Sequence, residues 1–194
     1  MYQKQSGLIL GFHGCDAKVQ RSILKSSSHH LTGSLNDYDW LGNGIYFWEN
    51  NPERAMQFAK EKKKREPEEI KIPSVLGAII DLGNCLDLLD AENSALVKAA
   101  YEDLKKIYQS SGLPLPQNVS FEDEGKYNLL LRPLDCLVIE HLLKSNDFDS
   151  VRGLFPEGEE LYDGSGFRSK DHIQICIRNR NCIKGYFLPR KTED

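Results

Sequence analysis

The sequence predicts an α+β fold for the chain of 194 residues, because strand-like apolar runs and amphipathic helical segments both occur along it. Short runs rich in β-branched and aromatic residues indicate strands. Apolar residues that recur every three or four positions indicate helices. The expected strands cover residues 7–12, 45–48, 75–82, 173–177 and 183–188. The expected helices cover residues 17–25, a segment that begins at Pro52, a segment from Asp90 or Asn93 to Tyr108, and residues 134–143.

Capping residues support two of these helices. Asp16 is the expected N-cap of the helix over residues 17–25, and Asn51 that of the helix beginning at Pro52. Proline is favoured at this first position because its missing N–H is not needed there. Residues 145–169 are rich in glycine and proline and are predicted to form one long loop, which in a compact domain is usually functional.

The composition is that of a single domain spanning residues 1–194. With 40% hydrophobic residues, 28% charged residues and a net charge of −4, the chain has no global attraction to nucleic acid or to an anionic membrane. No apolar run approaches the roughly 20 residues that span a bilayer, so no membrane partner is expected. Five cysteines without a C-x-x-C pair, and no apolar leader, favour reduced thiols and a cytoplasmic location. No zinc-type spacing of Cys and His is present, so no metal is expected.

Two short motifs predict a ligand site. In residues 41–48, Leu-Gly-Asn-Gly-Ile-Tyr-Phe-Trp, a glycine-rich turn leads into a strand that carries Tyr46. In residues 8–14, Leu-Ile-Leu-Gly-Phe-His-Gly, an apolar strand ends in His13 and Gly14. Each motif by itself is compatible with an ordinary core residue. Together they place two polar rings beside glycines, where a backbone or a ligand can approach closely.

These motifs resemble those of the ADP-ribosyltransferase superfamily, in the branch of the poly(ADP-ribose) polymerases and diphtheria toxin that is called the His-Tyr-Glu group. Phe12-His13-Gly14 resembles the family's strand with "HG", and residues 42–47 resemble its "GxGIYF" motif in order and separation. The resemblance covers about a third of the chain. It implies split antiparallel β-sheets with flanking helices, and NAD⁺ as a co-substrate.

The resemblance also implies a role for each motif residue. His13 would hydrogen-bond the adenine-side ribose, since imidazole offers a donor and an acceptor. Gly14 would hold the nicotinamide carboxamide through its backbone. Tyr46 would stack on the nicotinamide ring, where a flat cation over an aromatic face gains about 1–2 kcal/mol. Arg54 stands where the family commonly has a small hydroxyl residue, and it either turns toward a phosphate or points to solvent.

The third motif departs from the family pattern. Gln174 takes the position of the family's catalytic glutamate, which keeps hydrogen bonding but loses the charge that stabilises the transition state. Three outcomes follow: transfer of single ADP-ribose units, replacement by a carboxylate from the preceding loop, or binding of NAD⁺ without turnover. Asp171 and His172 either activate an acceptor or begin a solvated strand. The loop carboxylates that could replace the glutamate are Glu157, Glu159, Glu160 and Asp163.

The sequence therefore predicts a mono-ADP-ribosyltransferase that modifies a macromolecular acceptor, either protein or nucleic acid, with catalytic residues His13, Tyr46 and Gln174. Tyr162, Phe167 and Arg168 are the candidates for acceptor recognition, because an aromatic ring and an arginine can stack on a base or contact an acidic protein surface. A bacterial toxin or defence effector, with an inhibitor or antitoxin as a partner, suits the small size. The alternatives are a non-catalytic NAD⁺ or ADP-ribose binding module and an NAD⁺ glycohydrolase.

Overall fold

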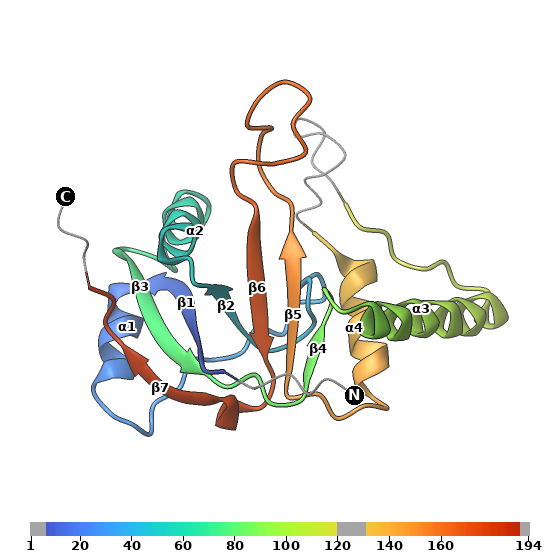
Figure 1. Ribbon diagram of the computed structural model, residues 1–194, viewed down its shortest axis with the longest axis horizontal. Coiled ribbons are helices and arrows are strands. Elements are labelled where there is room, and N and C mark those ends of the chain that lie inside the picture. Colours follow the sequence, from blue (N-terminus) through green and yellow to red (C-terminus); the bar gives the residue numbers. More distant parts are fainter. Residues whose placement is uncertain (1–6, 120–130, 191–194) are drawn as a thin grey trace.

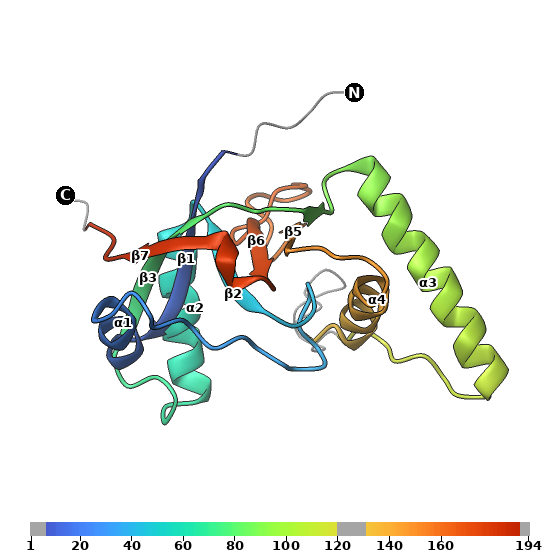
Figure 2. The ribbon, with the colours of Figure 1, turned by 90° about the horizontal axis from the view of Figure 1, so that it is seen from below.

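The computed structural model describes residues 7–119 and 131–190, which form an α+β structure around one mixed seven-stranded sheet. The strand order is β4-β5-β6-β2-β1-β3-β7, and every neighbouring pair is antiparallel except β4 and β5. Helices α1 and α2 lie beside β1 and β3, whereas α3 and α4 lie at the β4 end of the sheet (Figures 1 and 2).

The strands are β1 (Ile9–Asp16), β2 (Ile45–Glu49), β3 (Pro73–Ile80), β4 (Cys85–Asp87), β5 (Ser150–Phe155), β6 (His172–Ile177) and β7 (Ile183–Phe187). The helices are α1 (Ala17–Leu24), α2 (Pro52–Arg65), α3 (Ala91–Ser111) and α4 (Pro133–Leu143), with a short 3₁₀ turn η1 (Arg180–Cys182) before β7. The side chain of Asp16 accepts a hydrogen bond from the N–H of Lys18, and that of Asn51 accepts one from Arg54. Both predicted caps are confirmed.

The sheet is continuous but has a short joint at its centre. β1 pairs with β3 over its whole length, whereas it pairs with β2 at only two positions, Gly11 with Glu49 and Phe12 with Trp48. This joint connects two half-sheets: the β1 half, which consists of β1, β3 and β7, and the β2 half, which consists of β2, β6, β5 and β4. The two halves meet at this joint, and the sheet is mixed rather than wholly antiparallel, because β4 is parallel to β5.

Three apolar clusters hold the sheet and the helices together. Phe47 of β2 is fully buried with Leu76 and Ile80 of β3, so one face of the β2 half contacts the β1 half. The opposite face packs Val151 of β5 against Ile139 of α4 and its neighbours. A third cluster joins α2 to β1 and β2, with Ala55 fully buried. The burial of apolar area on both faces of β2 fixes the position of this central strand.

The prediction of one loop over residues 145–169 was wrong, because β5 lies inside it. Arg152 and Gly153 interrupt the apolar pattern that would have marked a strand. Arg152 is nevertheless accommodated, since it pairs with Glu49 and Asp87 on neighbouring strands. The loop that remains runs from residue 156 to residue 171 and projects beyond the sheet (Figure 1).

The sequence predicts neither a membrane-spanning segment nor a metal site, and both expectations can be compared with the described residues. None of the helices in residues 7–119 and 131–190 is long and apolar enough to cross a membrane. In the same two segments, no group of three or more His, Cys, Asp or Glu side chains could hold a metal ion. The expectation about a leader falls on residues 1–6, which lie outside the described part of the chain.

Candidate functional site

A cleft of about 1170 Å³ lies at the joint between the two half-sheets, and both motifs line it. Five residues singled out from the sequence contribute to its wall: His13, Gly14, Tyr46, Arg54 and Gln174. They come from β1, β2, α2 and β6 and span most of the chain. The residues that the sequence associated with a ligand are therefore brought together in one concave site.

His13 crosses the joint and bonds to the other half-sheet. Its Nδ1 lies 2.7 Å from the carbonyl oxygen of Tyr46, and its ring packs edge-on against Phe47. A carbonyl oxygen only accepts, so Nδ1 carries the proton and Nε2 is left as an acceptor. Burial lowers the pKa of His13, which keeps the ring neutral at pH 7. The tautomer that the sequence left open is thereby assigned.

The direction of the β1 backbone explains what Gly14 offers. Backbone N–H and C=O groups in an antiparallel strand point alternately to its two neighbours. The carbonyl of Leu10 accepts a hydrogen bond from the N–H of Asn50, on the β2 side of the strand, at 2.9 Å. Since β1 keeps a regular register with β3, Phe12 and Gly14 also direct their backbone groups toward β2.

A continued ladder would pair Gly14 with Tyr46, but the β1–β2 register ends two residues earlier along β1. The Tyr46 carbonyl accepts from the His13 imidazole, in the place where it would accept from Gly14. The side chain of His13 thus ends the ladder, and the backbone of Gly14 faces the cleft. Glycine is required here for a second reason, because a Cβ atom would collide with the carbonyl oxygen of Ala55 in α2.

The Gly42-Asn43-Gly44 turn is held firmly. Asn43 donates its N–H to Glu140 Oε1 at 2.7 Å, and Arg178 Nη1 bonds the Asn43 carbonyl at 2.9 Å and Glu140 Oε1 at 2.6 Å. Gly42 has φ +77°, which favours glycine, and a Cβ atom there would lie 2.5 Å from the Glu140 carboxylate. The turn is a fixed part of the wall.

The hydroxyl of Tyr46 belongs to this turn. It donates to the Gly42 carbonyl at 2.7 Å and accepts from the Leu41 N–H at 2.9 Å. Burial raises the pKa of Tyr46 well above its ordinary value, so the phenol stays neutral. With both hydrogen-bonding directions of the hydroxyl in use, the aromatic ring is the part of Tyr46 available to the cleft.

Arg54 does not point to solvent, because it is only 5% exposed. Its Nη2 donates to Glu157 Oε1 at 2.6 Å, and its Cζ lies 5.9 Å from the centre of the Trp48 ring. Arg54 Nε and Nη1 and Trp48 Nε1 are buried without a hydrogen-bond partner. Buried donors of this kind cost free energy unless a ligand or water satisfies them.

Gln174 lines the cleft from β6, opposite Trp48 in the register. Glu157 lines the same cleft and is 8% exposed, so it is the loop carboxylate that reaches the site. The other three carboxylates considered for this role, Glu159, Glu160 and Asp163, do not line the cleft. Of these alternatives the geometry retains Glu157.

Asp171 and His172, at the start of β6, make contacts that hold the structure. Asp171 accepts hydrogen bonds from the backbone N–H of Glu157 and of Arg168, so it holds the loop. His172 is 4% exposed, and its Nδ1 donates to the Lys170 carbonyl at 2.7 Å. The expected solvated strand start holds for Asp171, which is exposed, and is wrong for His172, because its imidazole packs among aromatic rings of β2 and β5. Neither residue lines the cleft.

The loop over residues 156–171 carries the three residues considered for acceptor recognition. Tyr162 and Phe167 are 63% and 65% exposed. Arg168 instead turns inward, where its Nη1 donates to the Gly158 carbonyl at 3.0 Å. The loop thus presents two aromatic rings to solvent, and its arginine stabilises the loop itself.

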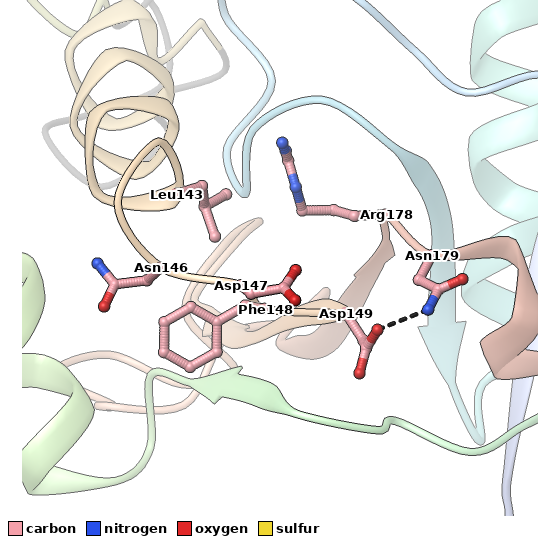
Figure 3. Close-up of a pocket in the computed structure, with 7 residues that line it drawn as sticks. All are labelled: Leu143, Asn146, Asp147, Phe148, Asp149, Arg178 and Asn179. Carbon is pink, nitrogen blue, oxygen red and sulfur yellow. Dashed lines mark hydrogen bonds between the residues drawn. The ribbon is translucent and has the colours of Figure 1, made fainter.

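A second hollow, of about 390 Å³, lies between α4 and the start of β5 (Figure 3). Its carboxylate Asp149 accepts from Asn179 Nδ2 at 2.6 Å and from the Asn84 N–H at 2.9 Å. The Arg178 guanidinium is turned away from Asp149 (Figure 3), toward the glycine turn. Asp149 and Arg178 of this hollow are engaged with the protein, and the residues predicted from the sequence line the larger cleft, which is therefore the candidate site.

Sequence reasoning missed several residues that line the cleft. Trp48 and Phe58 pack with ring centres 4.9 Å apart. Lys170, from the loop, lies 3.0 Å from Glu61 Oε1 across the cleft. The aromatic character of β2 was visible in the sequence, but Phe58 and Glu61 were read only as parts of α2. Phe58 and Glu61 both face the cleft because α2 packs against β1.

Comparison with known proteins identifies a relative. The chain is similar to the uncharacterized protein MJ0359 of Methanocaldococcus jannaschii, with 26% identity in an alignment 198 positions long that covers 89% of this chain and 83% of the relative. No family model matches the sequence, and no solved structure matches it. The relative's name states no activity, so the chemistry of the site rests on the geometry described above.

Proposed function

We propose that this protein is a mono-ADP-ribosyltransferase that uses NAD⁺ to modify a macromolecular acceptor, and that its sheet is of the ADP-ribosyltransferase type. The observation that carries the proposal is the His13–Tyr46 contact across the joint, which closes the ladder and turns the Gly14 backbone into the cleft. The division of the sheet into two halves that share two residue pairs supports the proposed fold.

In the proposed reaction, the bond between the nicotinamide nitrogen and the ribose C1′ breaks, and its electron pair leaves with nicotinamide. C1′ then bonds to a nucleophile of the acceptor, which loses a proton. The Nε2 atom of the neutral His13 would accept a hydrogen bond from a ribose hydroxyl. The Gly14 backbone would hold the carboxamide, and the Tyr46 ring would face the nicotinamide. These contacts supply orientation, which is a large part of catalysis for a reactive leaving group.

Gln174 and Glu157 would share the work done by a single glutamate in the family. The Gln174 amide can bond a ribose hydroxyl, and the Glu157 carboxylate supplies negative charge in the same cleft. Both residues are part of the proposal, because transfer of a single unit needs charge stabilisation and positioning. A binding module without turnover is the second candidate, and the neutral side chain at position 174 favours it.

The test is incubation of the purified protein with cell extract and NAD⁺ labelled in its adenylate half. Label should appear on macromolecules, and separate protease and nuclease digestion then identifies the acceptor class. His13→Ala should lower transfer at least about 100-fold by misplacing the donor. His29→Ala is the matched control, because His29 is an exposed histidine bonded to the Ser22 carbonyl.

The outcomes separate the candidate functions. Nicotinamide release without macromolecular label indicates a glycohydrolase. Calorimetric binding of NAD⁺ without nicotinamide release indicates a binding module, and a gain of activity in Gln174→Glu would support that reading. Neither binding nor release of nicotinamide would refute the use of NAD⁺ altogether.

A further inference from the structure

Several hydrogen-bond donors around Arg54 have no acceptor. Because they are buried, each such donor costs free energy. One nitrogen of Arg54 bonds Glu157, while Nε, Nη1 and the indole Nε1 of Trp48 have no hydrogen-bond partner. The arginine side chain is more than nine-tenths buried and lines the cleft. Three N–H groups of this kind in one place are typical of a site that completes itself with a ligand.

Two carboxylates, Glu61 and Glu157, face the cations of the same place. Lys170 Nζ lies 3.0 Å from Glu61 Oε1 and 3.9 Å from Glu157 Oε1, and Arg54 Nη1 lies 3.8 Å from Glu61 Oε2. Two cations therefore face two carboxylates. The Glu61 side chain is 39% exposed and the Glu157 side chain is 11% exposed, so Glu157 is the anion enclosed with the cations.

We propose that Arg54, Lys170 and Trp48 bind a phosphate group, and that Glu157 occupies its place in the ligand-free protein. A carboxylate has two oxygens, and Glu157 satisfies one of the three guanidinium nitrogens. A phosphate presents more acceptor oxygens and matches the fork of a guanidinium. It can therefore engage donors that the carboxylate leaves unsatisfied.

The exchange requires little movement of the chain. The backbone of Glu157 is fixed, because its N–H donates to Asp171 Oδ1 at 3.2 Å and its carbonyl accepts from the Lys170 N–H at 2.9 Å. Rotation of the Glu157 side chain is enough to vacate the position. The same rotation would deliver its carboxylate to another part of the cleft, so phosphate binding and the position of this charge are coupled.

The phosphate could come from the diphosphate of the donor or from the acceptor. The inference rests on the proposed function only in the case where the phosphate belongs to NAD⁺. The phosphate site itself is a property of these four side chains, and it can be tested in the absence of turnover.

Tryptophan fluorescence tests the proposal directly. The sequence holds two tryptophans, so Trp40→Phe leaves Trp48 as the reporter beside Arg54. This variant is titrated with inorganic phosphate and with ADP at constant ionic strength, and calorimetry on the unaltered chain accompanies it. A saturable change is expected with both. Glu157→Gln should lower the apparent Kd about tenfold by removing the competing anion.

Two further variants complete the test. Glu159→Gln, an exposed carboxylate of the same loop, should leave the Kd unchanged. Arg54→Gln should abolish binding, and if it does not fold, Lys170→Gln should weaken binding in its place. The proposal is overturned if phosphate and ADP both fail to give a saturable signal in the Trp40→Phe protein and also in its Glu157→Gln variant. It is also overturned if Glu159→Gln lowers the Kd as much as Glu157→Gln does.

The two sources of phosphate give different results. Competition between ADP and NAD⁺ at this site assigns it to the donor, whereas phosphate binding that leaves NAD⁺ affinity unchanged assigns it to the acceptor. Both results support the phosphate site. Phosphate binding without any use of NAD⁺ would refute the proposed function and leave this inference standing.

Discussion

Two arginines with little exposed side chain, Arg54 at 6% and Arg152 at 16%, are used in opposite ways. Arg152 of β5 directs all three of its nitrogens to carboxylates: Nε and Nη2 bond Glu49 at 2.6 and 3.0 Å, and Nη1 bonds Asp87 at 3.2 Å. Arg54 of α2 has one nitrogen in a hydrogen bond and leaves two without one. The less buried of the two guanidiniums is the more completely hydrogen-bonded one.

The partners explain the difference. Glu49 and Asp87 lie on strands of the same sheet as Arg152, so their positions are fixed by the backbone ladder. Glu157 comes from the loop that follows β5. A fully satisfied buried arginine stabilises the fold, and a partly satisfied one beside a cleft is suited to a ligand. The comparison makes Arg152 a structural residue and Arg54 a binding residue.

The largest expected effect is on Arg152. Arg152→Met should lower the free energy of unfolding by about 3 kcal/mol, because it leaves the buried carboxylate of Asp87 and the partly buried one of Glu49 without their cation. Urea denaturation followed by circular dichroism measures this change. Arg178→Met is the matched control, since Arg178 bonds a partly exposed carboxylate and should cost less. A loss of under about 1 kcal/mol in Arg152→Met would contradict the structural role.

A smaller effect is expected at Arg54. Arg54→Met should lower the free energy of unfolding by about 1–2 kcal/mol, because it removes one strong hydrogen bond together with two unsatisfied donors. Lys170, at 3.9 Å, remains as a cation near Glu157. The same denaturation experiment, repeated with 10 mM or so of phosphate, should stabilise the parent and not the variant. Equal losses in Arg54→Met and Arg152→Met would remove the distinction between the two arginines.

The smallest expected effect is a dependence of stability on pH around Arg54. Burial lowers the pKa of His172, and the Arg54 charge lowers it further, whereas Glu157 opposes this. Burial also lowers the pKa of His13. The unfolded chain therefore binds more protons below the ordinary histidine pKa of about 6.5, so stability should fall as the pH drops through that value.

Urea midpoints at pH 7.5 and pH 5.5 measure this dependence. Arg54→Met should flatten it, because the variant lacks a positive charge beside His172. His172→Phe should flatten it too, since the ring packs among aromatic side chains. Unchanged slopes in both variants would show that the cluster around Arg54 does not respond to protons.

Much of the fold follows from local sequence signals. The caps at Asp16 and Asn51, the proline at the start of α2 and the aromatic run of β2 each indicate an element within a few residues. β5 was missed because Arg152 is stabilised by carboxylates 65 and 103 positions away, which no local pattern contains. The parallel pairing with β4 has the same origin, since it depends on contacts between distant segments.

The sequence predicted which residues form much of the candidate site, but it predicted only part of their geometry. The two motifs identified His13, Gly14 and Tyr46, and the structure places them in one cleft. The sequence could not give the tautomer of His13 or the partner of Arg54. Both depend on atoms that the folding of the sheet brings together, across 33 positions for His13 and 103 for Arg54.

The short joint between β1 and β2 also fixes the shape of a suitable ligand. Pairing with β2 ends at Phe12, and β1 continues to Asp16. With a rise of about 3.3 Å per residue, these four residues open a slot about 13 Å long beside the strand. An elongated molecule that lies parallel to β1 therefore makes more contact there than a compact one.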